Sequence, residues 1–178
     1  MKNGLWVLAI VSAGFVACSK APEKAAEKAI ESAMSKDGTK AKVDLSSGST
    51  KITTTDASGK TSQMEIGGAK VAEADVGVPF YPGAKVGEGA SSKVSTPEGT
   101  MYTVMLQTPD AADKVATFYR DKLKSMSEGK QMMDMSGGDG AANLMLADEK
   151  TKSMIQVHVM KGEKGTDVQI VANRPVAK

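Results

Sequence analysis

The sequence predicts an α+β fold: an N-terminal helix and a small β-meander, then an antiparallel sheet packed on one face by a single helix. Short segments that alternate apolar and polar residues recur between residues 40 and 172. Segments such as Ser-Gly-Gly-Asp-Gly, which carry turn-forming residues, separate them. Residues 108–126 instead show the spacing of an amphipathic helix. These three observations define the predicted fold class.

Composition limits the classes of function. A chain of 178 residues is long enough for one domain with a small appendage. Its formal net charge is +2, and acidic and basic residues are interleaved, so we expect no nucleic-acid partner. The chain contains 1 cysteine, so an intramolecular disulfide cannot form and the fold must be stable without one.

The N-terminus has the pattern of an export signal. Lys2 is followed by an apolar run from Leu5 to Ala17. A transmembrane helix needs about 20 residues, so this run fits the core of a signal peptide better. The run ends in Phe15-Val16-Ala17-Cys18, which resembles the lipobox of bacterial lipoproteins. Phe15 departs from the leucine that is usual in that family, and Ala17 supplies the small residue before the cysteine.

This resemblance implies a lipid anchor at Cys18. In the family, the thiol is alkylated with a diacylglyceryl group, the signal peptide is removed, and the new amine is acylated, for example with palmitate. Ser19 follows Cys18, in place of the aspartate associated with inner-membrane retention. The resemblance therefore implies an outer-membrane lipoprotein that faces the periplasm. Each buried methylene contributes about 0.8 kcal/mol, so several acyl chains together anchor a protein stably. The alternative is an incidental cysteine near an ordinary cleavage site.

A helical spacer is expected after the cysteine. Residues 21–34 are rich in alanine, glutamate and lysine, which favour helix, and Gly38 suits its end. We expect Glu27 and Lys28 to face water. The apolar residues form one thin stripe: Ala26, Ile30, Ala33 and Met34. Such a helix acts either as a spacer of about 20 Å or as a partner-binding element.

A small β-meander is predicted next. Residues 40–45, 50–55 and 61–66 are β-rich runs separated by turn residues. Their apolar residues are few: Val43, Leu45, Ile52, Met64 and Ile66. These are too few for an independent core, so we expect the meander to lean on another part of the molecule.

The remaining chain predicts the α+β domain. A hairpin turns at residues 97–99, and strands are expected at 131–135, 143–147, 153–160 and 167–172. Between them lies a helix with Thr108 as its cap, Pro109 at its first position and Asp110 in its first turn. Its expected buried stripe is Ala112, Val115, Ala116, Tyr119, Leu123 and Met126, with Phe118 beside it.

A second resemblance covers the central third of the chain. The segment "VPFYPGA" precedes "TPDAADKVATFYRDKL", a pattern similar to that of uncharacterised bacterial envelope lipoproteins with a Pro-x-Tyr-Pro-Gly-Ala segment. The residues that carry it are Phe80 to Ala84, Val115, Phe118, Tyr119 and Leu123. They are turn formers and core anchors, so the resemblance implies a small α+β domain and an envelope location, and no activity. The predicted domains are a signal peptide (1–17), a lipidated N-terminus and spacer (18–38), the meander (39–76) and the α+β domain (77–178).

Catalytic chemistry is not expected. The chain has one histidine, His158, and lacks paired-cysteine or histidine spacing for a metal. It also lacks a Gly-x-Ser-x-Gly elbow and a phosphate-binding loop. We therefore predict that the protein is not an enzyme and has no catalytic residue, cofactor or resident metal.

Methionine is the unusual feature of the predicted strands. One side of residues 101–106 and 153–160 is apolar and suits the helix: Tyr102, Val104, Leu106, Ile155, Val157 and Val159. The other side carries Met101, Thr103, Met105, Met154, Gln156, His158 and Met160, and residues 131–135 add Met132, Met133 and Met135. Three interpretations are open for this second face. The meander covers it, it binds a protein, peptide or lipid, or its thioethers and His158 bind Cu(I).

The predicted function is a non-catalytic structural or partner-binding role for an outer-membrane lipoprotein. Its partners would be the membrane, through the lipid at Cys18, and an envelope protein or peptide. The alternative is a periplasmic protein that binds a small ligand or Cu(I) at the Met-rich face. The sequence does not decide whether that face is buried or exposed.

Overall fold

The computed structural model describes residues 21–35, 38–46, 48–137 and 140–176. The predicted signal peptide and Cys18 lie outside these residues.

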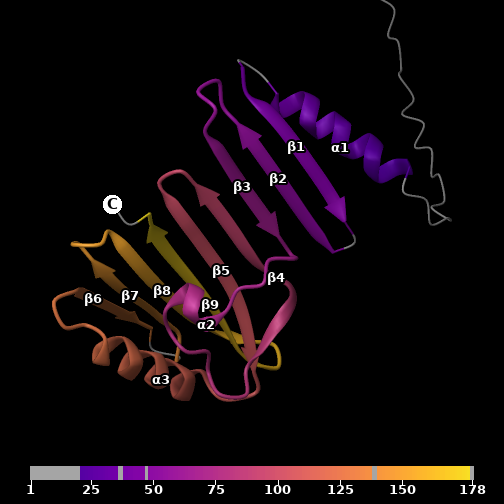
Figure 1. Cartoon of the computed structure of the whole chain (residues 1–178). Helices are drawn as coiled ribbons and strands as arrows, with labels where there is room; N and C mark the ends of the chain where they lie inside the picture. Colours follow the sequence, from indigo (N-terminus) through magenta and orange to yellow (C-terminus); the bar gives the residue numbers. More distant parts are fainter. Residues whose placement is uncertain (1–20, 36–37, 47, 138–139, 177–178) are drawn as a thin grey trace, which may run out of the picture.

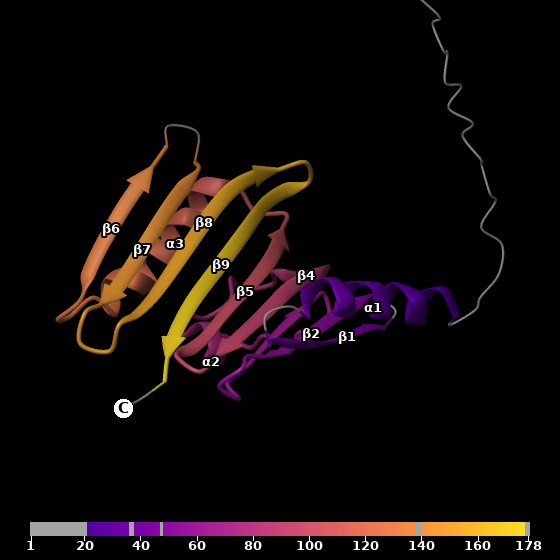
Figure 2. The same ribbon diagram turned by 90° about the horizontal axis from the view of Figure 1, so that it is seen from above.

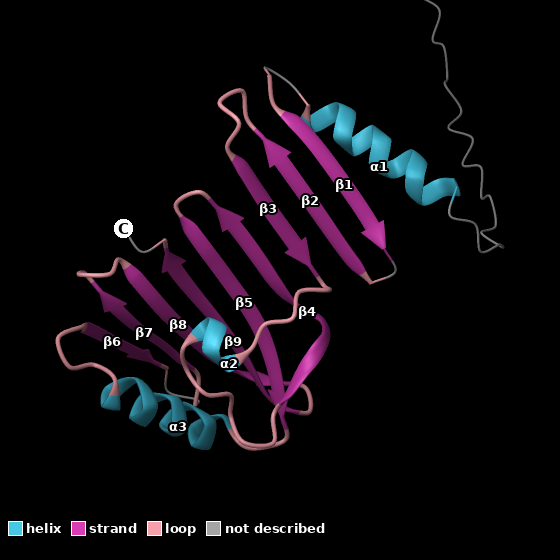
Figure 3. Cartoon of the chain, in the orientation of Figure 1, coloured by secondary structure: helices cyan, strands magenta, loops and turns pink. Residues whose placement is uncertain are grey.

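A single antiparallel sheet of nine strands dominates the described chain (Figures 1 and 3). Its spatial order is β1-β2-β3-β4-β5-β9-β8-β7-β6. The strands are β1 (Lys40–Ser46), β2 (Ser49–Thr55), β3 (Thr61–Ile66), β4 (Lys85–Thr96), β5 (Gly99–Thr108), β6 (Gln131–Ser136), β7 (Ala142–Asp148), β8 (Ser153–Gly162) and β9 (Gly165–Pro175). The short segments of alternating polarity in the sequence are confirmed as strands.

The predicted fold class is wrong. β3 pairs antiparallel with β4, from Gln63 opposite Ser95 to Ile66 opposite Ser92, so the meander continues the sheet. The protein is therefore one sheet-dominated unit instead of an α+β fold with a meander and a separate sheet. Strands pair through their backbone N–H and C=O groups. The pattern of side chains along a strand therefore does not show which other strand it pairs with.

In the described part of the chain, three helices accompany the sheet: α1 (Ala21–Met34), α2 (Glu73–Val76) and α3 (Ala112–Ser125). Figure 2 shows α1 and α3 at opposite ends of the sheet. α3 packs on β7 and β8, whereas α1 lies against the edge strand β1. The predicted N-terminal helix is confirmed, and the four-residue α2 was not predicted.

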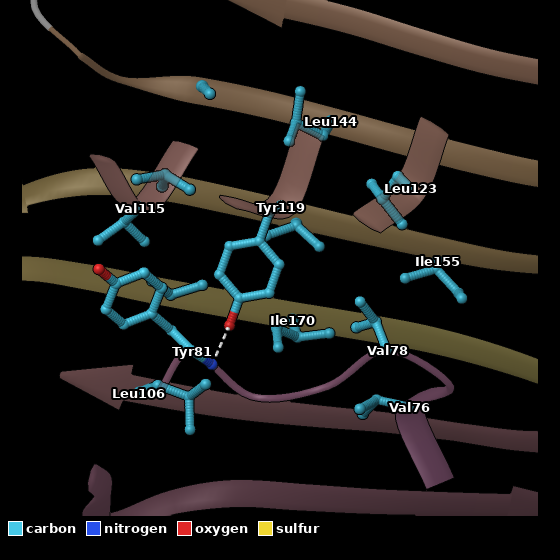
Figure 4. Packing of buried hydrophobic residues seen from close by; sticks show 14 of the residues in the cluster. Val76, Val78, Tyr81, Leu106, Val115, Tyr119, Leu123, Leu144, Ile155 and Ile170 are labelled. Atoms are coloured by element: carbon cyan, nitrogen blue, oxygen red, sulfur yellow. Dashed lines mark hydrogen bonds between the residues drawn. The ribbon is translucent and has the colours of Figure 1, made fainter. Parts of the chain in front are cut away.

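The hydrophobic core lies between α3, the segment around α2, and one face of the strands β5, β9, β8 and β7 (Figure 4). The predicted helix stripe is confirmed, because Val115, Ala116, Tyr119 and Leu123 are buried. The strands contribute Val104, Leu106, Ala142, Leu144, Leu146, Ile155, Val157, Val159, Val168, Ile170 and Ala172. The predicted apolar side of the strands therefore faces α3.

The predicted start of α3 is wrong by three residues. Its N-cap is Ala111, not Thr108. Thr108 ends β5 and lies opposite Thr166 of β9, so the sheet ladder holds it as a strand residue. The carboxylate of Asp110 accepts hydrogen bonds from the Tyr81 hydroxyl at 2.5 Å and the Lys114 ammonium at 2.8 Å.

Aromatic side chains hold residues 77–84 against the core, as predicted. The Tyr81 ring is buried and meets Phe118 edge to face, with 5.2 Å between ring centroids. The Tyr81 backbone N–H donates to the Tyr119 hydroxyl at 3.0 Å, the dashed line in Figure 4. At the tip, Gly83 has φ +77° and Ala84 N–H donates to Tyr81 C=O at 2.9 Å, which confirms a turn.

Candidate partner-binding face

The face of the sheet opposite α3 is built by rows of residues that run across the strands. Residues directly opposite each other in an antiparallel pair point to the same face. One row crosses all nine strands through Val43, Ile52, Met64, Val94, Met101, Asn173, Met154, Ala147 and Gln131. The next contains Leu45, Thr50, Ile66, Ser92, Thr103, Val171, Gln156, Met145 and Met133.

Two shorter rows complete this surface. They contain Met105, Gln169, His158, Asn143 and Met135, and then Lys85, Gln107, Asp167 and Met160. We call these four rows the open face. Within them, the charged side chains are Asp167 and Lys85, both in the last row, and His158 is the one other ionisable group.

The open face is exposed except at β1, where Val43 is buried. Met101 and Met133 are each 44% exposed, and Met135 is 57% exposed. Met64, Ile66, Met105 and Met160 are also exposed. The interpretation that the meander covers this face is wrong, because β1–β3 extend the sheet beside it. The structure therefore shows that the Met-rich side of the strands is exposed, which the sequence did not decide.

Charge lies on the other face of the same strands. Asp44, Lys51, Glu65 and Lys93 form one cross-strand row on β1–β4, on the side that α3 occupies farther along the sheet. Lys93 Nζ lies 5.5 Å from the centroid of the Tyr102 ring. A solvated face of a sheet is ordinarily the charged one. Here one exposed face carries apolar and neutral polar residues, which is the pattern of an interaction surface.

The methionines gather toward the β6 end of the open face. Met133 lies directly opposite Met145. Met135 and Met154 are diagonal neighbours of Met145, on β6 and β8 respectively. Cβ atoms are about 4.5–5.5 Å apart in direct pairs, and diagonal neighbours are about 7–8 Å apart. We call these four residues the methionine group. Met145 was missed from the sequence, since strand register is needed to place it beside Met133.

His158 lies on the predicted face, and like Met154 it is a diagonal neighbour of Met145. It shares that face of β8 with Met154, Gln156 and Met160, so this predicted alternation is confirmed. Its direct cross-strand neighbours are Gln169 and Asn143. These two residues separate it from Met105 and Met135 in the same row.

A hollow of about 690 Å³ lies beside the turn between β8 and β9. Its lining includes Lys85, Thr108, Glu163, Lys164, Thr166 and Asp167. The two threonine hydroxyls are engaged with the Asp110 backbone: Thr108 Oγ1 accepts from its N–H and Thr166 Oγ1 donates to its C=O. The threonine hydroxyls that line the hollow are therefore already hydrogen-bonded to backbone, and its charged lining residues are the carboxylates Glu163 and Asp167 and the lysines Lys85 and Lys164. In the part of the chain that the structure describes, no group of three His, Cys, Asp or Glu residues could hold a metal ion.

No family model, curated protein or solved structure matches the chain. Among the described residues, no helix has the length and apolar character needed to cross a bilayer. The predicted lipidation site, Cys18, lies outside those residues. Within them, the open face is the feature whose geometry and chemistry bear most directly on function.

Proposed function

We propose that this protein is an outer-membrane lipoprotein, anchored through Cys18 and facing the periplasm, whose open face binds a partner protein in a non-catalytic role. The observation that carries the proposal is an exposed face, nine strands wide, with a single carboxylate and many apolar side chains. The lipobox pattern at residues 15–18 supports the location.

The chemistry of the open face indicates what kind of surface the partner presents. Methionine side chains are flexible and polarizable, so they adapt to varied apolar surfaces. Neutral hydrogen-bonding groups lie among the methionines, on Thr103, Asn143, Gln156 and Gln169. Burying an unpaired charge against this surface would be costly, so the partner surface is apolar and neutral polar.

A protein partner fits this face better than a lipid bilayer. Segments that lie on anionic membranes are rich in lysine and arginine, and the four rows of the open face contain one such residue, Lys85, which shares its row with Asp167. In this proposal the protein is instead held at the membrane by the lipid on Cys18. The two contacts are therefore separate and can be tested separately.

The test of partner binding places a charge on the open face in intact cells. Met101→Asp combined with Met133→Asp introduces two carboxylates at exposed positions. We expect chemical crosslinking to the partner to fall by about tenfold or more, because about 1.4 kcal/mol of lost binding has that effect. Val86→Asp is the matched control, since Val86 is 47% exposed but lies opposite Leu106, on the α3 side. Equal crosslinking by all three proteins would contradict the proposal.

The anchor is tested by Cys18→Ala. The unlipidated protein should leave the membrane fraction during cell fractionation. Retention of Cys18→Ala in the outer-membrane fraction would refute the lipoprotein assignment, and would leave the open-face experiment to be judged on its own.

A second candidate function is Cu(I) binding by the methionine group. Thioethers suit Cu(I), and Met133 and Met145 directly oppose each other on adjacent strands. Competition with a chromogenic Cu(I) chelator should detect binding that Met133→Leu with Met145→Leu abolishes. The matched control is Met105→Leu with Met160→Leu, outside the group. Binding that is lost equally in both pairs would count against this site.

A further inference from the structure

The outer edge of β1 is covered by side chains of α1. The backbone N–H groups of Ala41, Val43 and Leu45 point away from β2. The Ser35 hydroxyl accepts from Ala41 N–H at 3.0 Å. Oε1 of Glu31 accepts from Val43 N–H at 2.8 Å, and Oε1 of Glu27 accepts from Leu45 N–H at 2.9 Å. The expectation that Glu27 faces water is therefore wrong.

The spacing of these acceptors matches the strand. Four residues of helix rise about 6 Å, and two residues of strand rise about 6.6–6.8 Å. Residues 27, 31 and 35 therefore meet alternate N–H groups of β1 in turn, with helix and strand running in opposite directions. The stripe of acceptors on α1 takes the place of a further strand at this edge of the sheet.

The contact that holds α1 is a narrow one. Among the described parts of the fold, α1 packs against β1 and no other element makes comparable contact with it. Ile30 is half-buried, while Ala26, Ala33 and Met34 of the predicted stripe are exposed. Helices of this length are marginal in water without tertiary packing. The position of α1 over this edge of the sheet therefore depends mainly on its contact with β1.

We propose that α1 is a displaceable cover, and that the edge it protects pairs with β1 of a second copy of this chain. The two copies of β1 would run antiparallel, with Val43 opposite Val43 on the two-fold axis. Backbone carbonyls of the second copy would then accept the hydrogen bonds that Glu27, Glu31 and Ser35 accept in the covered state. Exposed edge strands are the usual site of such pairing.

The sequence of β1 is complementary to itself in this register. Lys42 lies opposite Asp44 of the second copy and Ala41 lies opposite Leu45, so charges attract and apolar residues meet. All three N–H groups that α1 now covers face the new partner. Such a two-fold contact closes on itself, whereas pairing of β1 with β6 of another copy would continue into open chains.

The first experiment removes the acceptors from the full chain. Glu27→Ala with Glu31→Ala should double the mass measured by light scattering in detergent, at concentrations where the wild type is a monomer. Glu27→Gln with Glu31→Gln keeps the acceptor oxygens and should remain monomeric. Glu23→Ala is the matched control for loss of an exposed glutamate on α1. A monomeric double-alanine variant with the wild-type circular dichroism spectrum overturns the proposal.

The second experiment tests the register. In the double-alanine background, Lys42→Asp places carboxylates opposite Asp44 and should restore the monomer. Adding Asp44→Lys should bring the dimer back. Assemblies larger than a dimer would overturn pairing through β1. So would a dimer whose formation is unaffected by either charge change.

A third experiment keeps α1 intact, so that it does not depend on the folding of the double variant. Val43→Cys in the Cys18→Ser chain leaves one thiol, on the proposed two-fold axis. Cα atoms of a hydrogen-bonded antiparallel pair are about 5.5 Å apart, within the range for a disulfide. Covalent dimer should form faster as protein concentration rises, and Lys42→Cys, whose thiols would be offset, should form little. Equal or absent crosslinking at both positions overturns the proposal.

Discussion

At the scale of single residues, Tyr119 joins α3 to the segment that crosses over the sheet. Its side chain is fully buried, and its hydroxyl accepts the backbone N–H of Tyr81 at 3.0 Å. Burial raises the pKa of this hydroxyl well above its ordinary value, so it stays protonated at any pH the protein meets. The hydroxyl therefore acts as a structural acceptor.

Tyr119→Phe should destabilise the fold by about 1–3 kcal/mol, because the Tyr81 N–H would remain buried without a partner. The measurement is urea unfolding at neutral pH. Tyr102→Phe is the matched control, since the Tyr102 hydroxyl makes no hydrogen bond to any residue that the structure describes. A Tyr119→Phe variant as stable as that control would show that water satisfies the N–H.

Asp110 makes the stability of the fold depend on pH in the acid range. Hydrogen bonds from Lys114 and then from the Tyr81 hydroxyl lower the pKa of its carboxyl. A carboxyl with a lowered pKa contributes stability that is fully present above its unfolded value, about 3.9, and is lost as pH falls through the folded value. Asp110→Asn should therefore lower the melting temperature at pH 7, and the difference from wild type should shrink below about pH 4. Thermal unfolding between pH 3 and pH 7 checks this, and a difference that is constant with pH would contradict it.

At the scale of elements, Gly77 ends α2 at a crowded position. It has φ +72°, and a Cβ placed there would lie 1.6 Å from Arg174 Nη2. Arg174 Nε donates to Asp75 C=O at 3.3 Å and so links β9 to α2. Gly83 has φ +77° with open space around it, which makes it the natural comparison.

Gly83→Ala should cost about 1–2 kcal/mol, the penalty of a left-handed conformation for a residue with a Cβ. Gly77→Ala should cost about 1 kcal/mol more, because Arg174 must also leave its contact with α2. Denaturant unfolding of both variants measures the difference. Equal losses would mean that Arg174 moves aside without consequence.

The elements also show what a local pattern can and cannot predict. Alternating residues such as Ile155, Val157 and Val159 predicted β8 and the side of it that is buried. The start of α3 was misplaced because Thr108 and Pro109 look like a helix cap, while the ladder between β5 and β9 holds Thr108 in a strand. α2 was missed because four residues carry no periodicity, and Glu27 was misjudged because its partner is a backbone group of β1.

At the scale of the whole molecule, the sheet has two ends that are stabilised differently. Strands β5 and β7–β9 pack against α3 through a continuous core. Strands β1–β3 bury little: Val43 is buried, while Met64 and Ile66 are exposed. Because burial of apolar surface is the main stabilising contribution, the β1–β3 end should open at a lower free energy.

Hydrogen exchange should reveal this difference. Backbone amides of β2, which pair on both sides, should exchange about tenfold faster or more than those of β8, the ratio that corresponds to about 1.4 kcal/mol. Both strands lie inside the sheet, so their comparison separates core burial from edge position. Equal protection in β2 and β8 would show that the sheet opens as a single cooperative unit.

The sequence alone determined the strands, the buried stripe of α3 and the side of the strands on which most methionines lie, because these follow from residue spacing along one element. The prediction that Met132 shares this side was wrong, since Met132 lies opposite Leu146 and packs against the core. The tertiary structure decided that β3 joins β4, that the open face is exposed beyond β1, and that Met145 lies beside Met133. It also decided that Glu27 and Glu31 protect the edge of β1. These facts depend on backbone hydrogen bonds between segments far apart in the chain, and such bonds leave no periodic trace in the side chains.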